Sequence, residues 1–271
     1  MAAAAPKKEE PQDQKEAPQG FALQSKPAWL TFVGRPDSGK SHAMRHIIQE
    51  HMRSSDPFHF GVVFVKTKFN GEWSKNKYNE DQDSPDFIDD KYVNPGFAKG
   101  ETFTVEKLHA YIQRLERYTD DTGKKHPKNF VVLDDLQGLR NANDPLMQSV
   151  VASYRHTNSH FFISAQYLNV GTSTGEREVS VYNFLFCSDG HRSVKSWYEW
   201  FGQKCESFEE FKKLLEDVTD SDKHHVLLFL AGKNTKRESY FQWKAGEVDP
   251  NFKVLFPHDK KRLEAKEKQG V

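Results

Sequence analysis

Gly34-Arg35-Pro36-Asp37-Ser38-Gly39-Lys40-Ser41 is the stretch of this chain that decides its fold. It matches the phosphate-binding loop pattern G-x-x-x-x-G-K-[ST] (Walker A) at every constrained position. An apolar run at residues 29–33 enters the stretch as a strand would, and a segment of helical character at residues 41–50 leaves it. This order surrounds a phosphate with backbone N–H groups and the positive end of a helix dipole. The sequence therefore predicts a site for a nucleoside triphosphate.

The side chains at the end of the loop indicate how the triphosphate is held. We expect Lys40 to reach the β- and γ-phosphates and the Ser41 hydroxyl to bind Mg²⁺. The expected cofactors are therefore ATP and Mg²⁺. The alternative, a chance match in a polar turn, does not account for the flanking strand and helix. The residues expected around the nucleotide are Gly34, Arg35, Pro36, Asp37, Ser38, Gly39, Lys40, Ser41 and His42.

Composition limits the class of protein. The 271 residues suffice for one large α/β domain, and 39 basic residues balance 39 acidic ones. A nucleic-acid partner would therefore have to be met by local basic loops. The two cysteines, Cys187 and Cys205, have no metal-ligand spacing, and a reduced compartment explains them more simply than a disulfide. Without an apolar run of about 18 residues or a signal-peptide core, we expect a soluble intracellular protein with no membrane span.

The chain divides into a central domain and two polar ends. Residues 1–25 are rich in Ala, Pro, Gln, Lys and Glu, which predicts a disordered N-terminal tail. Residues 26–256 form the expected P-loop ATPase domain, with a long polar insert at 66–102. Residues 257–271 are dense in charge and predict a charged C-terminal tail or a frayed helix.

Strand and helix patterns alternate through the central domain. Short apolar runs predict strands at 29–33, 60–65, 130–133, 161–164, 182–187, 226–230 and 240–243. Helical patterns cover 41–52, 105–118, 145–156, 194–201 and 208–218. The alternation predicts an α/β fold with a largely parallel central sheet flanked by helices, and antiparallel strands at its C-terminal end.

A second motif, Asn129-Phe130-Val131-Val132-Leu133-Asp134-Asp135, is typical of a Walker B strand. We expect Asp134 to hold Mg²⁺ and Asp135 to polarise the attacking water. A strand ending in a helix-capping aspartate pair is the alternative. The long separation between Lys40 and Asp134 leaves room for further βα units, and so predicts an additional strand between the two motif strands.

A third signal follows in Arg155-His156-Thr157-Asn158 and the apolar run that ends at Gln166. A glutamine at the end of the strand beside Walker B can sense the γ-phosphate or position water, and an exposed arginine can serve as a finger for a neighbouring subunit. The alternatives are an Arg155 that complements a helix dipole and a Gln166 that closes a strand.

Taken in order, Gly34–Ser41, the pair Asp134 and Asp135, Arg155 and Gln166 resemble the HerA–FtsK superfamily of DNA-pumping ATPases. More narrowly, the chain resembles the genome-packaging ATPases of poxviruses, other large nucleocytoplasmic DNA viruses and virophage-like elements. Those proteins similarly carry a double aspartate, an Arg-His-x-Asn-like stretch and a Ser-Gln or Ser-x-Gln strand end. The resemblance covers about residues 28–245. Because Ala165 separates Ser164 from Gln166, which of the two side chains senses phosphate stays open.

The resemblance implies a RecA/FtsK-like P-loop NTPase that hydrolyses ATP to move double-stranded DNA into a viral capsid. It implies a ring-shaped homo-oligomer, hexameric or pentameric, with Arg155 completing a neighbour's site. In this family Lys40, Asp135, Arg155 and Gln166 would be catalytic, and Ser41 and Asp134 would bind the metal. Capsid or portal proteins are further partners, and the expected location is the virion or the assembly site in the host cytoplasm or nucleus.

Two loops are candidates for DNA contact. Residues 66–78 combine four lysines with three aromatics, and residues 171–180 carry Arg177. Solvated surface loops are an equally good account of both. Two rival functions are a P-loop kinase of a small molecule or nucleotide, which would need an arginine-rich lid that we do not find, and a non-catalytic nucleotide switch, against which the paired aspartates argue.

Overall fold

A computed structural model describes residues 23, 26–66, 73–74, 86–96, 101–122, 126–136, 138–139, 144–168, 172–188, 190–220, 225–233 and 235–268. Except for Leu23, the tail expected at residues 1–25 lies outside the described residues. So does much of the insert at 66–102 and the end of the segment 257–271.

In the described part of the chain, seven strands form one sheet in the order β2-β3-β4-β1-β5-β6-β7. The pairings among β1 to β5 are parallel, whereas β6 runs antiparallel to both β5 and β7. The strand predictions and the antiparallel C-terminal end are thus confirmed, with boundaries that differ by up to two residues. The strands are β1 (Trp29–Val33), β2 (Phe60–Val65), β3 (Asn129–Asp134), β4 (Ser159–Ala165), β5 (Ser180–Leu185), β6 (His225–Leu230) and β7 (Tyr240–Lys244).

The predicted additional strand is present, since β4 lies between the P-loop strand β1 and the aspartate-bearing strand β3. The long separation between the motifs predicted that this strand comes from the chain between them. The chain between the two motifs contains β2 and α2 (Val105–Thr122), and the inserted strand comes from the segment after β3. Sequence spacing therefore gave the right architecture through the wrong segment.

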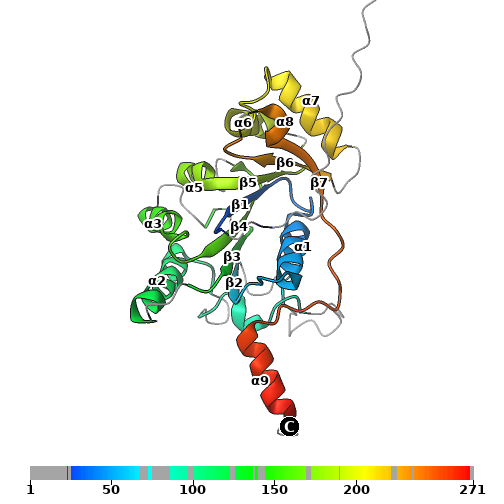
Figure 1. Cartoon of the computed structure of the whole chain (residues 1–271). Coiled ribbons are helices and arrows are strands. Elements are labelled where there is room, and N and C mark those ends of the chain that lie inside the picture. The colour runs from blue at the N-terminus through cyan, green and yellow to red at the C-terminus, as the bar shows by residue number, and fades with distance from the viewer. Residues whose placement is uncertain are drawn as a thin grey trace, which may run out of the picture.

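Helices cover both faces of the sheet, and the alternation of each strand decides which face a side chain meets (Figure 1). On β3, Phe130 and Val132 join the core beneath α1, whereas Val131 and Leu133 join the core beneath α2 and α3. Beyond β1, helices α6 and α7 pack on the second face through Trp197 and other apolar residues. The further helices are α1 (Lys40–Arg53), α3 (Pro145–Ser153), α5 (Thr174–Val179), α6 (His191–Phe201), α7 (Phe208–Thr219) and α8 (Lys236–Ser239).

The segment expected as a C-terminal tail begins as part of the packed domain. Helix α9 (Pro257–Lys268) projects from the body, but its first turn is anchored to the short helix η1 (Asp90–Tyr92) (Figure 1). Asp259 accepts hydrogen bonds from Lys91 Nζ (2.6 Å) and Tyr92 Oη (2.9 Å). The packing therefore extends past the predicted boundary at residue 256.

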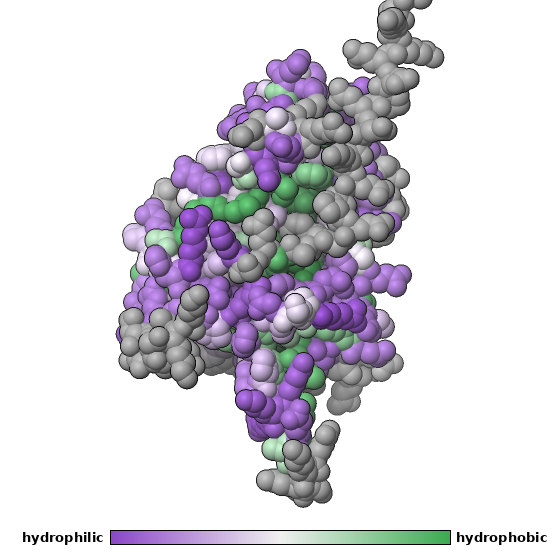
Figure 2. Space-filling view, viewed as in Figure 1, coloured by the Kyte–Doolittle hydropathy of each residue, from purple (hydrophilic) through white to green (hydrophobic). Residues whose placement is uncertain are grey.

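The visible surface is mostly hydrophilic, with apolar side chains along the middle, where the sheet lies between its helix layers (Figure 2). No helix in the described part of the chain is long and apolar enough to cross a bilayer.

Candidate nucleotide site

The P-loop joins the end of β1 to the start of α1 through two left-handed residues, Asp37 (φ 56°) and Gly39 (φ 90°). Gly34 is needed for a different reason. A Cβ atom there would lie 2.5 Å from the Cβ atom of Phe186, just beyond the end of β5. That approach is too close for any side chain, so the loop is fixed against the end of the neighbouring strand.

Lys40 lies within the loop that precedes it. Its Nζ atom donates to the carbonyl oxygens of Gly34 (2.9 Å) and Arg35 (2.6 Å), and the residue is buried. A buried ammonium group surrounded by loop backbone provides a positive charge where a phosphate would bind. The loop therefore fits a triphosphate.

Ser41 connects the P-loop to the second motif. Its hydroxyl donates to Oδ2 of Asp134 over 2.9 Å, which brings together residues from α1 and β3. A hydroxyl and a carboxylate are the oxygen ligands that Mg²⁺ takes in sites of this kind, with waters and substrate phosphates completing the octahedron. This pair fits the metal that the sequence predicts.

Ser164 on β4 links the two aspartates. Its buried hydroxyl donates to Oδ1 of Asp134 (2.6 Å) and accepts from the backbone N–H of Asp135 (2.8 Å). With both directions of the hydroxyl used inside the protein, Ser164 is placed to position the acids. Of the two side chains at this strand end, Gln166 is the one that reaches the surface of the site.

Asp135 and Gln166 form the outer part of the site. Asp135 follows β3 in a left-handed conformation (φ 50°), which an aspartate tolerates better than most residues, and its side chain is exposed. Gln166 Nε2 donates to Oδ1 of Asp135 over 3.0 Å. The carboxylate is thus accessible and held in one orientation.

Trp73 is a member of this site that sequence reasoning missed. Although it belongs to the stretch predicted to contact DNA, it is fully buried, and its Nε1–H donates to Oδ2 of Asp134 over 2.8 Å. The prediction that this side chain contacts DNA is therefore wrong. A lone tryptophan in a polar insert signalled only that the segment packs somewhere.

Arg155 lies apart from these residues. It follows α3 and precedes β4, whose seven residues span about 23 Å between Arg155 and the P-loop edge. The guanidinium is exposed and its Nε–H donates to Tyr154 Oη (2.9 Å). The structure does not bring Arg155 to the phosphate site of its own chain.

Two other predicted residues use their side chains elsewhere. His42 Nε2 lies 3.0 Å from the carbonyl oxygen of Gly246, so its ring contacts the segment that follows β7. Arg177 donates to the carbonyl of Thr172 (2.7 Å) and lies 4.2 Å from the ring of Trp200, and burial lowers the pKa of its guanidinium. Arg177 is therefore a structural residue of α5, which replaces the loop expected there.

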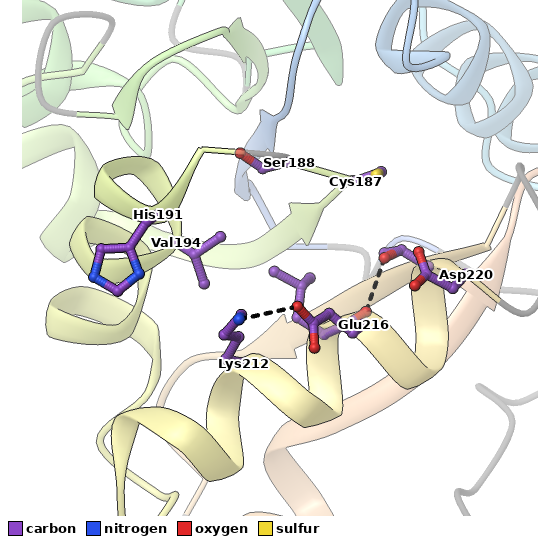
Figure 3. A pocket seen from close by; sticks show the side chains of 9 residues that line it. Cys187, Ser188, His191, Val194, Lys212, Glu216 and Asp220 are labelled. Carbon is purple, nitrogen blue, oxygen red and sulfur yellow. Dashed lines mark hydrogen bonds and ion pairs between the residues drawn. The ribbon is translucent and has the colours of Figure 1, made fainter.

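A polar hollow lies at the same edge of the sheet as the P-loop (Figure 3). Cys187, the residue after Phe186, lines this hollow, whose volume is about 220 Å³. Lys212 and Glu216 of α7 form an ion pair of 3.4 Å in its wall. The remaining lining residues are Ser188, His191, Val194, Leu215, Thr219 and Asp220.

This fold is shared with viral genome-packaging NTPases. The genome-packaging NTPase B204 of Sulfolobus turreted icosahedral virus 2, solved with sulfate, has a TM-score of 0.54 at 13% identity, covering 84% of this chain and 100% of that chain. B204 of Sulfolobus turreted icosahedral virus, a DNA-packaging ATPase, has a TM-score of 0.54 at 11% identity, covering 83% and 100%. The virus 2 protein solved with AMP has a TM-score of 0.51 at 13% identity, covering 79% and 100%.

No protein-family model and no curated protein sequence matches the chain. At such low identities the likeness establishes the fold, a mixed α/β P-loop NTPase with a mostly parallel sheet flanked by helices. The narrower assignment to the poxvirus type stays a prediction.

Proposed function

We propose that this protein is an ATP-hydrolysing DNA translocase that packages double-stranded DNA into a viral capsid as an oligomeric ring. The observation that carries the proposal is the continuous chain of hydrogen bonds Ser41–Asp134–Ser164–Asp135–Gln166 beside the P-loop. It joins a metal-binding pair to an accessible carboxylate, as hydrolysis requires. The fold that this chain shares with the B204 packaging NTPases supports double-stranded DNA as the cargo.

The inner residues bind the nucleotide in this proposal. Backbone N–H groups of the loop between Asp37 and Ser41 and the ammonium of Lys40 hold the phosphates, with Lys40 exchanging its carbonyl partners for phosphate oxygens. Ser41 and Asp134 hold Mg²⁺, which when bound neutralises charge on the β- and γ-phosphates.

The outer residues activate water. The accessible carboxylate of Asp135 accepts a proton from the attacking water, and the amide of Gln166 keeps that carboxylate aligned. Ser164 transmits the position of Asp134 to the Asp135 backbone, so metal ligand and base move as one unit.

Arg155 acts on a neighbouring subunit. Because it lies at the sheet edge away from its own P-loop, any role at a phosphate must be played at another chain's site. A head-to-tail contact brings unlike surfaces of two copies together, and such contacts form a ring when the rotation from one copy to the next closes. The subunits of a ring would thus each complete the next site.

The DNA-binding surface must be local, since the chain has no net charge. Of the two predicted loops, residues 66–78 lie mostly outside the described residues, and Arg177 is engaged in its own turn. Lysines of the insert remain our candidates, with capsid or portal proteins as further partners at the assembly site. Binding through phosphates predicts affinity that falls steeply with salt.

Phosphate release with and without double-stranded DNA tests the proposal. We expect DNA to stimulate release, Lys40→Ala to abolish it, and Asp135→Asn to lower it by about 10²- to 10⁴-fold. Asp217→Asn, on the exposed side of α7, is the control and should match the wild type. Unchanged release in Asp135→Asn would remove Asp135 as the base. Absence of release by the wild type would favour the nucleotide switch, and phosphoryl transfer to a nucleotide acceptor without DNA dependence would favour the kinase.

A further inference from the structure

Among the described residues, three side chains donate hydrogen bonds to the carboxylate of Asp134, and they come from three separate segments of the chain. Ser164 of β4 reaches Oδ1, whereas Ser41 of α1 and Trp73 of the insert both reach Oδ2. The first two belong to the motifs described above. The third ties the insert directly to the predicted metal ligand.

The position of Trp73 is set by the insert's own contacts with the domain. Its carbonyl oxygen accepts from the Ile88 N–H (3.0 Å), and its ring packs edge-on against Phe87, with centroids 5.7 Å apart. Ile88 is fully buried and forms a bridge with Val254. The indole is therefore a rigid donor whose direction depends on the positions of Phe87 and Ile88.

Ser41 and Trp73 differ in what they can do when a metal arrives. A serine hydroxyl rotates about a single bond, so Ser41 can turn its oxygen toward a cation. An indole N–H is a donor only and cannot ligate a metal. Trp73 thus remains as the donor on Oδ2, where it keeps the carboxylate plane fixed.

We propose that Trp73 is a positioning residue for the Mg²⁺ carboxylate Asp134, and that it couples the described residues 86–88 of the insert to the metal site. This role rests on the proposed function, because it concerns the metal-bound nucleotide. It links Phe87 and Ile88 through the indole to the carboxylate of the nucleotide site.

Trp73→Phe removes the donor, and Trp29→Phe is the matched control. Both tryptophans are fully buried, but Trp29 has no hydrogen-bond partner for its Nε1–H among the described residues and packs on the opposite face of the sheet.

Affinity for a fluorescent ATP analogue is measured with Mg²⁺ and with EDTA, and Mn²⁺ binding is followed by electron paramagnetic resonance. For Trp73→Phe we expect about a tenfold loss of affinity with metal and none without it, since a hydrogen bond to a charged group is lost.

Trp29→Phe should match the wild-type affinity under each condition and should retain Mn²⁺ binding. Should Trp73→Phe fail to fold, 3-benzothienylalanine at position 73 keeps the ring volume and lacks only the N–H donor. If either of these two variants shows the same metal dependence of affinity as the wild type, this role alone is overturned. Absence of ATP-analogue binding by the wild type would overturn the proposed function and this role together.

Discussion

The side-chain amide of Gln166 donates a hydrogen bond to Oδ1 of Asp135 over 3.0 Å, across the ends of two adjacent strands. Loss of this donor leaves the carboxylate free to rotate while the P-loop stays intact. Gln166→Ala should therefore lower the rate of ATP hydrolysis by about 10²-fold, the effect typical of one oriented polar group, and leave ATP affinity unchanged. Steady-state phosphate release and analogue binding measure the two quantities. Gln148→Ala, on the exposed side of α3, is the control; a full rate in Gln166→Ala would remove Gln166 from the water-activating unit.

Arg155 should act only between subunits. Arg155→Ala and Lys40→Ala should each be inactive alone, but mixed rings pair an intact P-loop with an intact arginine. We expect activity at about a quarter of the interfaces in a random equal mixture, because each interface takes one residue from each neighbour. Arg192→Ala, an exposed arginine of α6, should be active by itself. If mixing restores nothing, the finger assignment is wrong.

Gly34→Ala should disable the P-loop through sterics. The new Cβ would lie 2.5 Å from the Phe186 Cβ atom, which is attached to backbone and cannot move cheaply. Overpacking of about 1–3 kcal/mol at the loop should weaken ATP binding about tenfold or more. Gly175→Ala is the contrast, since its Cβ would meet only a Val151 methyl at 3.9 Å. Calorimetric titration with ATP distinguishes them, and equal affinities would show that the loop can relax away from β5.

His51 should make stability depend on pH. Burial, and secondarily the charge of Lys128, lowers its pKa from 6.5 to about 4, while Asp56 opposes the shift and the His160 ring lies 6.1 Å away. The unfolded chain binds this proton more readily, so the contribution is complete above pH 6.5 and is lost as the pH falls toward 4. Between about pH 7 and pH 5 the loss should be about 2 kcal/mol.

Urea unfolding at both pH values measures that loss. His51→Gln removes the titrating group and should flatten the pH dependence, although the variant is less stable throughout because its ring no longer packs on Phe58. His156→Gln, at an exposed position, should keep the wild-type dependence. An unchanged pH dependence in His51→Gln would assign the acid sensitivity to other groups.

Local patterns made the fold and the inner site predictable. The strand, turn and helix around Gly34 are consecutive in sequence, so the loop needs no distant residue to be recognised. The same holds for the apolar run ending at Asp134, and both motifs meet because parallel strands end at one edge of a sheet. The presence of a strand between the two motif strands was predicted as well, although the separation of the motifs pointed to the wrong segment.

Only the tertiary structure shows which side chains donate to Asp134 and how far Arg155 lies from the P-loop. The motif spacing predicts that Ser41 and Asp134 meet, but nothing local to Trp73 indicates that its indole crosses 61 residues of sequence to the same oxygen. Likewise, only the parallel pairing of β4 with β1 shows that Arg155, which precedes β4, lies at the end of the sheet opposite the P-loop. The sequence by itself determined a P-loop nucleotide site; tertiary packing decided which side chains orient its acids, because hydrogen bonds between distant segments depend on register and burial that no local pattern encodes.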